Sequence, residues 1–598
     1  MLQQTAVYIT WEELFKDIPT YEEVVAVIRE FNRQSSVVLL ARLATHLFVD
    51  DFRGIPSETV DLQTFLISNF FDDHVLNRAR QVMPTERLDF RRPFHSQQIL
   101  TFLRWTVLHA LPVGGTQPDS DANARFALGR ALLKTNDLLL TQRMKDEIAR
   151  DRILKSATRY LRIQLSVGAG NEVSNPPPVV NAVARGTTIF EDIMKRISTP
   201  IDLSKQLEKK TGISLDAYVD LTLGTLMNYL SRSPKELMTN SGFGTMNPET
   251  YFGKSIPNET TQRYWAMETN TIDQLSNALT SSNNLAAHQD FTAYRVKPFL
   301  RLDSEAVICV NPGFLQEKLE IGLFWTIVNS LHGEDRQNAF EAWGKLFEAY
   351  INQNFEHAVD STKERYISSP DFSGKKHQHE AFDGLLLASR MCAVLECKGG
   401  FLPSSAKYAD SLDQFVQSLE QKFATEPGAG IEQLVRKIAQ VFAADEKERR
   451  QVADVDLSTV EIVVPVLVVQ DNFVASFLTV PWLAKSFRDQ MRKKTLSRKI
   501  VLTSLLVLHV EDVETLCTYA TARKCLLSEC LLYAGKMGDP GPGRLFAFAD
   551  ILRKFLLERK IEKVLSSELD TKFRDVINRL SLRLFNREFD PIDSNSPR

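Results

Sequence analysis

Three ionisable residues, Asp383, Glu396 and Lys398, lie in the otherwise apolar stretch AFDGLLLASRMCAVLECKGG, which spans residues 381–400. The run CAVLEC within it has the composition of a β-strand that is covered on both faces. Burying an ionised side chain costs several kcal/mol unless a partner neutralises it. The three groups therefore either neutralise one another or surround a cation.

The spacing of these residues predicts that one pair of strands brings them together. Side chains alternate across a strand, so Glu396 and Lys398 are expected on the same face. Asp383 begins the preceding strand, and a turn near residues 388–390 makes the two strands an antiparallel hairpin. Two converging carboxylates repel each other, which raises one pKa unless a divalent cation binds between them. Carboxylate oxygens suit Mg²⁺ or Mn²⁺ and a neighbouring lysine can hold the attacking water, which is the chemistry of metal-assisted phosphodiester hydrolysis.

The apolar pattern around the hairpin predicts an α/β domain over residues 334–512. The expected elements, in order, are a helix at 334–358, the two strands of the hairpin, helical segments at 411–423 and 430–442, and buried strands at 460–469 and 499–510. Helices and strands in this order form a mixed sheet with helices on its faces.

The remainder of the chain is predicted to be mainly helical. Residues 1–290 place apolar residues three and four apart, which predicts one or more helical domains with a break near residues 170–181. Residues 291–333 are predicted to form a β-hairpin around the turn DSE and a connecting helix. Residues 513–598 are expected to form a helical C-terminal extension with a disordered tail.

Asp383, twelve intervening residues and the motif Glu-x-Lys at 396–398, placed on adjacent strands, form an arrangement that resembles the PD-(D/E)XK nuclease superfamily. That superfamily includes restriction endonucleases and the nuclease domains of recombination exonucleases. The resemblance covers about residues 335–512 and implies a restriction-endonuclease-like α/β fold. The whole chain is then expected to be multidomain, with a large all-α region before this domain. The resemblance also implies that Asp383 and Glu396 bind Mg²⁺ or Mn²⁺ and that Lys398 is the catalytic lysine.

Two further positions fit the same resemblance. Glu348 flanks the apolar stripe of the helix at 334–358, as the family's first-helix acid does, and is a third candidate metal ligand. Gln433 lies on a helix after the motif, where some exonuclease-like members carry a glutamine at the edge of the site. Two positions depart from the pattern: Phe382 replaces a proline, and Lys437 stands where those members have a tyrosine.

One segment, KSFRDQMRKKTLSRK at residues 485–499, concentrates positive charge in a chain whose net charge is −3. It is either a solvated helix face or a track that contacts the phosphates of a nucleic acid, and its position between two core strands favours the track. Its basic residues are Lys485, Arg488, Arg492, Lys493, Lys494, Arg498 and Lys499. A separate lysine, Lys407, is predicted to be exposed, with a phosphate contact as the alternative.

The composition is that of an ordinary globular protein without a membrane-spanning segment. The chain has 598 residues and is 43% hydrophobic and 25% charged, and its length predicts roughly two to four domains. Its six cysteines form no CxxC pair, so they are expected to be reduced core residues of a cytoplasmic protein. The start of the chain lacks signal-peptide features, and the longest apolar runs are about half the length that spans a bilayer.

These features predict a Mg²⁺-dependent endo- or exodeoxyribonuclease whose N-terminal helical region selects the substrate or a partner protein. Bacterial anti-phage defence and DNA processing are the settings expected by analogy. The alternative is a catalytically inactive nuclease-fold module that serves as a nucleic-acid-binding or protein-interaction scaffold. The pattern leaves open whether DNA or RNA is the substrate, whether ends or interior are cut, and whether the chain forms a homo-oligomer.

Overall fold

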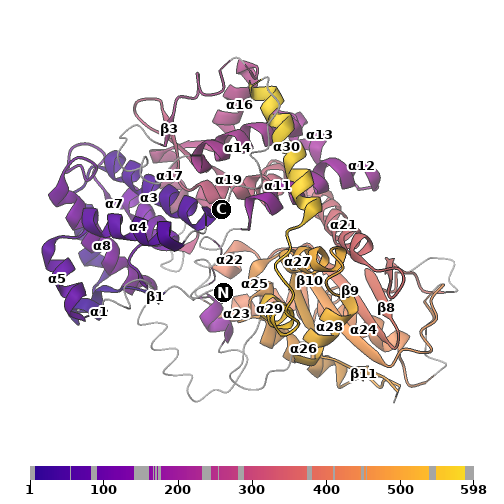
Figure 1. The fold of residues 1–598 in the computed structure, drawn as a ribbon. Helices are drawn as coiled ribbons and strands as arrows, with labels where there is room; N and C mark the ends of the chain where they lie inside the picture. The colour runs from indigo at the N-terminus through magenta and orange to yellow at the C-terminus, as the bar shows by residue number, and fades with distance from the viewer. Residues whose placement is uncertain are drawn as a thin grey trace.

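The computed structural model of the chain is a mixed α/β structure, with a helical N-terminal region and a central six-stranded sheet covered by helices (Figure 1). Among the described helices, none is both long and apolar enough to cross a membrane. The structure describes residues 7–53, 56–82, 91–140, 160–165, 168, 172, 177–231, 244–253, 255–280, 289–373, 380–408, 411–445, 450–452, 454–497, 499–537 and 547–585.

The described part of the first 290 residues is mainly helical, as predicted, but it also contains short strands. β1 (Val7–Tyr8) pairs in parallel with β2 (Arg91–Arg92), and β3 (Thr245–Met246) and β4 (Thr269–Thr271) join a second sheet. The expectation of an all-α region is wrong in this respect, because strands of two or three residues are too short to show alternation. The helices are α1 (Trp11–Phe15), α2 (Tyr21–Ile28), α3 (Arg33–Arg53), α4 (Pro56–Phe70), α5 (Asp73–Val82), α7 (Ser96–His109), α8 (Ala122–Leu140), α11 (Val179–Thr187), η2 (Thr188–Ile193), α12 (Met194–Arg196), α13 (Leu203–Thr211), α14 (Leu215–Leu230), α16 (Asn258–Glu268) and α17 (Ile272–Thr280).

The predicted hairpin after residue 290 is confirmed, since β5 (Phe299–Arg301) and β6 (Val307–Cys309) pair antiparallel. Glu305 takes a positive φ of 63° in the turn between them. The hairpin is joined to the preceding region, because β4 pairs with β5 and β3 pairs with β6 in one four-stranded sheet. The predicted boundary between residues 290 and 291 therefore divides the strands of one sheet. The helices around the hairpin are α18 (Thr292–Val296), α19 (Pro312–Lys318) and α20 (Ile321–Val328).

The central sheet has the strand order β11-β10-β9-β8-β7, with β12 also paired to β10. β7, β8 and β9 form an antiparallel meander, and β10 runs parallel to β9, β11 and β12, so the sheet is mixed as predicted. The apolar run at 499–510, expected as one strand, forms two, because the Ser504 N–H donates to the Gly535 carbonyl instead of to β10. The strands are β7 (Arg365–Ser368), β8 (Gly384–Ala388), β9 (Met391–Lys398), β10 (Ile462–Val469), β11 (Val501–Leu502) and β12 (Leu506–His509).

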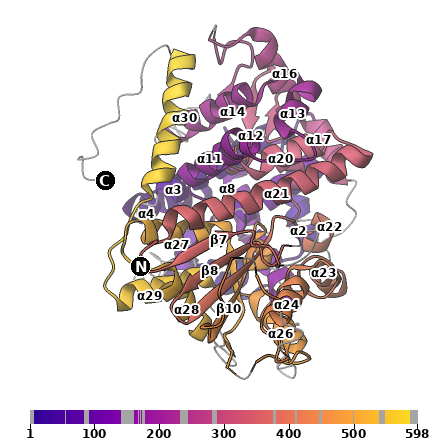
Figure 2. The same cartoon turned by 90° about the vertical axis from the view of Figure 1, so that its right-hand side faces the viewer.

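Side chains of the sheet alternate between two hydrophobic cores. Cys392 and Val394 of β9 belong to the core that α23, η4, α24 and α26 complete, whereas Ala393 and Leu395 belong to the core that α21, α27 and α28 complete. α21 runs along one side of the strands in Figure 2, and α24 and α26 lie on the other. These helices are α21 (Gly333–Ala358), α23 (Leu412–Leu419), η4 (Glu420–Ala424), α24 (Gly430–Val441), α26 (Val480–Met491), α27 (Val510–Thr521) and α28 (Leu527–Met537). Two short helices, α22 (Ser404–Lys407) and α25 (Asn472–Ala475), follow β9 and β10.

The C-terminal extension is helical where it is described, as predicted. After α29 (Phe548–Glu558), α30 (Ser567–Phe585) returns to the N-terminal region and packs along α11 (Figures 1 and 2). An ion pair of 2.7 Å between Lys572 Nζ and Asp192 Oδ2 joins α30 to η2, which follows α11 directly. The predicted disordered tail begins beyond residue 585 and lies outside the described residues. The same holds for most of the predicted break near 170–181, of which only 172 and 177–181 are described.

A buried arginine joins α11 to the helices that cover the sheet. Arg185 is 1% exposed. Its Nη1 lies 2.6 Å from Glu320 Oε1 and its Nε lies 2.6 Å from Glu514 Oε1. Tyr350 of α21 donates its hydroxyl to Glu514 Oε1 at 2.6 Å. Burial lowers the pKa of Arg185, but the charges of Glu320 and Glu514 outweigh it and raise that pKa above its ordinary value, so the arginine is held charged.

Candidate active site

The hairpin of β8 and β9 places Asp383, Glu396 and Lys398 at one end of the central sheet. Asp383 immediately precedes β8, and its N–H donates to the Leu395 carbonyl at 3.2 Å, which sets it level with Glu396. Glu396 and Lys398 share the face of β9 that turns toward α24, because side chains on a strand alternate. Asp383 and Glu396 are 7% and 1% exposed. The hairpin and the burial of both acids agree with the expectation from the sequence.

Lys398 links the hairpin to helix α24. Its Nζ lies 2.9 Å from Glu396 Oε1 and donates a hydrogen bond to Gln433 Oε1 at 2.8 Å. Asp383 accepts a hydrogen bond on Oδ2 from the Cys397 N–H at 2.7 Å, which orients its carboxylate. The structure thus brings four of the sequence-predicted site residues, Asp383, Glu396, Lys398 and Gln433, into one cluster.

A second lysine of α24, Lys437, lies between the two carboxylates of the hairpin. Its Nζ is 3.2 Å from Asp383 Oδ1 and 2.9 Å from Glu396 Oε2, and its side chain is 9% exposed. Burial lowers the pKa of Lys437, but the charges of Glu396 and Asp383 outweigh burial and raise it. A lysine ammonium is therefore the cation that lies among the buried acids.

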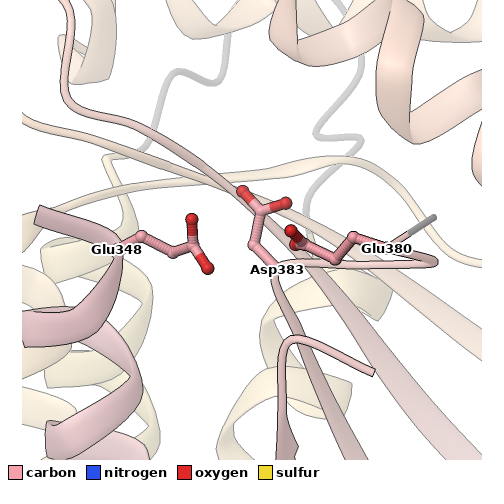
Figure 3. Close-up of side chains that lie close together, drawn as sticks. All are labelled: Glu348, Glu380 and Asp383. Atoms are coloured by element: carbon pink, nitrogen blue, oxygen red, sulfur yellow. The ribbon is translucent and has the colours of Figure 1, made fainter. Parts of the chain in front are cut away.

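Three carboxylates lie close together at this end of the sheet (Figure 3). Glu348 reaches the site from α21, Glu380 from the segment before β8, and Asp383 from the start of β8, and one oxygen of each lies within 4.8 Å of the others. Glu348 Oε1 accepts a hydrogen bond from Ser369 Oγ at 2.7 Å. Glu380 Oε1 is buried and has no hydrogen-bond partner among the described residues.

This grouping differs from the ligand set that the resemblance implied. The resemblance paired Asp383 with Glu396 and added Glu348, whereas the structure groups Asp383 with Glu348 and Glu380. Glu396 is instead held by Lys398 on one oxygen and by Lys437 on the other. The oxygens best placed to share a cation are therefore those of Glu348, Glu380 and Asp383.

The carboxyls of the site are not fully neutralised by the lysines. Burial, followed by the charge of Asp383, raises the pKa of Glu380 to about 9 and that of Glu396 to about 7. The same two causes raise the pKa of Glu348. Each of these shifts means that the ionised form is disfavoured as the site stands, so protons or a further cation are favoured there.

Glu380 and Lys437 are the site residues that sequence reasoning did not assign to the site. Glu380 ends the polar run KKHQHE three residues before Asp383, and nothing in that run distinguishes it from a surface acid. Lys437 follows Gln433 by four residues, which places both on one face of α24. The four-residue spacing from Gln433 is therefore a sequence signal that could have placed Lys437 at the site. No such signal exists for Glu380, which only the tertiary structure brings there.

The basic segment is exposed, but only its first part is helical. α26 ends at Met491, so Lys485 and Arg488 lie on the helix and the remaining charges follow it. The helix packs against α24, the helix that carries Gln433 and Lys437. The exposed basic residues are Lys485, Arg488, Arg492, Lys493, Lys494 and Lys499. Arg498 lies outside the described residues.

Lys407 is not the exposed lysine that was expected. Its side chain is 12% exposed, and its Nζ lies 3.1 Å from Glu172 Oε1 and 3.0 Å from Asp471 Oδ1. The same ammonium lies 4.8 Å from the ring centroid of Phe473. The prediction of exposure is wrong because α22 turns Lys407 inward to the carboxylates of Glu172 and Asp471.

No protein-family model, curated protein or solved structure matches this chain in sequence or fold comparisons. The three clustered carboxylates can hold a divalent cation, and Lys398, whose direction Glu396 and Gln433 fix, can present a donor to a water or phosphate beside it.

Proposed function

We propose that the chain is a metal-dependent nuclease of the PD-(D/E)XK type that hydrolyses phosphodiester bonds of DNA. The observation that carries the proposal is the convergence of Lys398, Glu396 and Gln433 beside the carboxylates of Glu348 and Asp383. The order α21, β7, β8, β9, α24, β10, with β10 parallel to β9, supports a restriction-endonuclease-like domain. The helical N-terminal region is proposed to select the substrate or a partner.

The residues of the site fit a divalent cation. Four carboxylates, those of Glu348, Glu380, Asp383 and Glu396, face the two ammonium groups of Lys398 and Lys437. The excess of two negative charges equals the charge of one Mg²⁺ or Mn²⁺. Carboxylate oxygens are the ligands that these ions prefer, and the buried oxygen of Glu380 lacks another partner among the described residues. Glu348, Glu380 and Asp383 would hold the ion.

The bound ion would act as a Lewis acid that lowers the pKa of water and neutralises phosphate charge. Lys398 would supply a hydrogen-bond donor next to the ion. An ammonium has three N–H groups, and Glu396 and Gln433 engage two of those on Lys398. Its side chain is 23% exposed, so the third N–H can reach a water or a phosphate oxygen. Glu396 and Gln433 therefore fix the direction of Lys398, and that direction sets where the reacting group is held.

The test of the proposal is cleavage by the purified full-length chain. Linear duplex, closed circular and single-stranded DNA, with RNA of the same sequence, are incubated with Mg²⁺, with Mn²⁺ or with EDTA. We expect DNA cleavage only with a metal ion, and cutting of the circle would show endonuclease action. Asp383→Asn removes a ligand charge and should lower the rate by about two orders of magnitude or more.

Cleavage in EDTA, or an Asp383→Asn rate equal to wild type, would overturn the proposal. If RNA were cleaved as fast as DNA, the proposed substrate would have to include RNA, but the proposed chemistry would stay the same.

One observation favours a second candidate function, a nuclease-like module without catalysis. The ammonium of Lys437 already pairs with Asp383 and Glu396, so the hairpin acids are partly neutralised without any metal. Such a module would bind nucleic acid or protein and would show no Mn²⁺ binding at millimolar concentrations. A metal titration followed by calorimetry separates the two functions.

Charge reversal in the basic segment should weaken nucleic-acid binding at every sequence alike. A chain of net charge −3 attracts a polyanion only through a local patch, and Arg492, Lys493 and Lys494 are exposed beside the helix that packs on α24. Changing all three to Glu should lower affinity and flatten the log–log salt dependence by roughly 0.9 for each phosphate of duplex DNA that the protein no longer neutralises. The measurement is DNA affinity across a salt series.

The matched control reverses three exposed lysines of α13, Lys205, Lys209 and Lys210, which changes net charge equally. Equal slopes for wild type and the Arg492, Lys493 and Lys494 variant would show that the segment is a solvated surface.

A further inference from the structure

Lys437 fills the space between Asp383 and Glu396 where a second cation would otherwise bind. We infer that its ammonium is a built-in counter-ion that limits the site to one divalent cation, held by Glu348, Glu380 and Asp383. The inference rests on the proposed function, since it concerns how that site binds metal. Lys437 is thus assigned as a positioning residue that determines the number of metal ions.

The geometry shows a lysine fixed in place. Its Nζ contacts one oxygen from each of Asp383 and Glu396, at 3.2 and 2.9 Å. Helix α24 holds its backbone, because Ile431, Leu434 and Ile438 of that helix are fully buried against the sheet. A cation at the same point would have to displace an ammonium that is almost completely enclosed.

The contacts of Lys437 and the group of clustered carboxylates share Asp383 but not Glu396. Both oxygens of Glu396 already contact an ammonium group, Oε1 that of Lys398 and Oε2 that of Lys437. Glu396 is also absent from the group of described carboxylates whose oxygens lie close enough to share an ion. Asp383 therefore stands between two cation positions, one filled by Lys437 and one bounded by Glu348 and Glu380.

The charge balance of the site also predicts one divalent cation. With Lys437 and Lys398 charged, one divalent cation balances the four carboxylates. A second divalent cation would lie next to the Lys437 ammonium and be repelled by it. Removing the ammonium would leave Asp383 without a lysine partner and Glu396 with Lys398 alone, which favours binding of a second cation in its place.

The test counts bound Mn²⁺ in the full-length chain by electron paramagnetic resonance of the free ion and by calorimetry. Wild type should bind one Mn²⁺ per chain, and Lys437→Met should bind two. Lys437→Gln, which keeps a hydrogen-bond donor to the carboxylates, is the second variant and should also bind two. Arg436→Met is the matched control, because Arg436 is the preceding residue of α24 and its side chain is 46% exposed. It should bind one ion.

Thermal denaturation gives an independent reading. Without metal, Lys437→Met should unfold at a lower temperature than wild type, and saturating Mn²⁺ should raise its Tm by more than it raises that of wild type.

Three outcomes would overturn the inference: two Mn²⁺ ions in wild type, one ion in both Lys437 variants, or no ion in wild type together with one in Lys437→Met. The wild-type count alone tests the inference if neither variant folds. A wild-type chain that binds one Mn²⁺ and cleaves no substrate would contradict the proposed nuclease function and leave the one-ion assignment standing.

Discussion

Replacing Lys398 with methionine is expected to lower metal-dependent cleavage by about 10²- to 10⁴-fold, the range typical of removing a group that moves a proton or stabilises developing charge. Glu396 and Gln433 direct the Lys398 ammonium, and methionine has a similar length but no donor. Mn²⁺ binding should persist, because Lys398 does not belong to the three clustered carboxylates.

Single-turnover cleavage and a Mn²⁺ titration measure the two effects separately. Lys209→Met, which removes an exposed lysine of α13, is the matched control and should cleave as wild type does. A cleavage rate of Lys398→Met within a few-fold of the wild-type rate would show that Lys398 has no catalytic role. If Lys398→Met lost both Mn²⁺ binding and activity, Lys398 would instead be needed for the structure of the metal site.

Replacing Arg185 with alanine is expected to lower the free energy of unfolding by about 3–5 kcal/mol, the usual cost of leaving a buried charge without its partner. Glu320 and Glu514 are 3% and 2% exposed, and Arg185 is the cation that contacts both. Without it the two carboxylates must take up protons or draw in water. The loss should be smaller when Glu514→Gln is combined with Arg185→Ala, since one orphaned charge is then removed.

Urea denaturation of wild type and variants measures this cost. A chain of 598 residues need not unfold in two states, so the first cooperative transition is the quantity to compare. Arg574→Ala is the control, because its partner Asp570 is one helical turn away and both side chains are about half exposed. Its expected effect is about 0.5 kcal/mol or less. An Arg185→Ala loss as small as that of the control would show that the buried network adds no stability.

The elements that the sequence predicted well are long and strongly patterned. β10 is an eight-residue run of apolar residues, β9 has eight residues that are apolar apart from Glu396 and Lys398, and α21 carries its apolar stripe over 26 residues. The short strands were missed or merged. β11 has two residues, and the break before β12 depends on a hydrogen bond from Ser504 to Gly535 of a later helix. A contact of that kind leaves no mark on the local pattern of either segment.

The site residues also differ in whether a local pattern is enough to place them. Asp383, Glu396 and Lys398 belong to one hairpin, so their proximity follows from strand pairing and side-chain alternation alone. The resemblance suggested Gln433 as a residue at the edge of the site, and in the structure its Oε1 lies 2.8 Å from Lys398 Nζ. Lys407 was predicted to be exposed, but Glu172 and Asp471 enclose it, and these partners lie far from it in the chain.

That charged groups are buried in a hairpin and need a counter-charge follows from the sequence alone, because an apolar strand composition and the cost of burying charge are local properties. The identity of the neutralising group depends on contacts between segments far apart in the chain. The packing of α24 on the sheet brings Lys437 to Glu396 across 41 positions of the chain, and the segment before β8 brings Glu380 to Glu348 of α21. Both contacts depend on how helices dock on the sheet, which is set by the two cores together and not by the residues at the site.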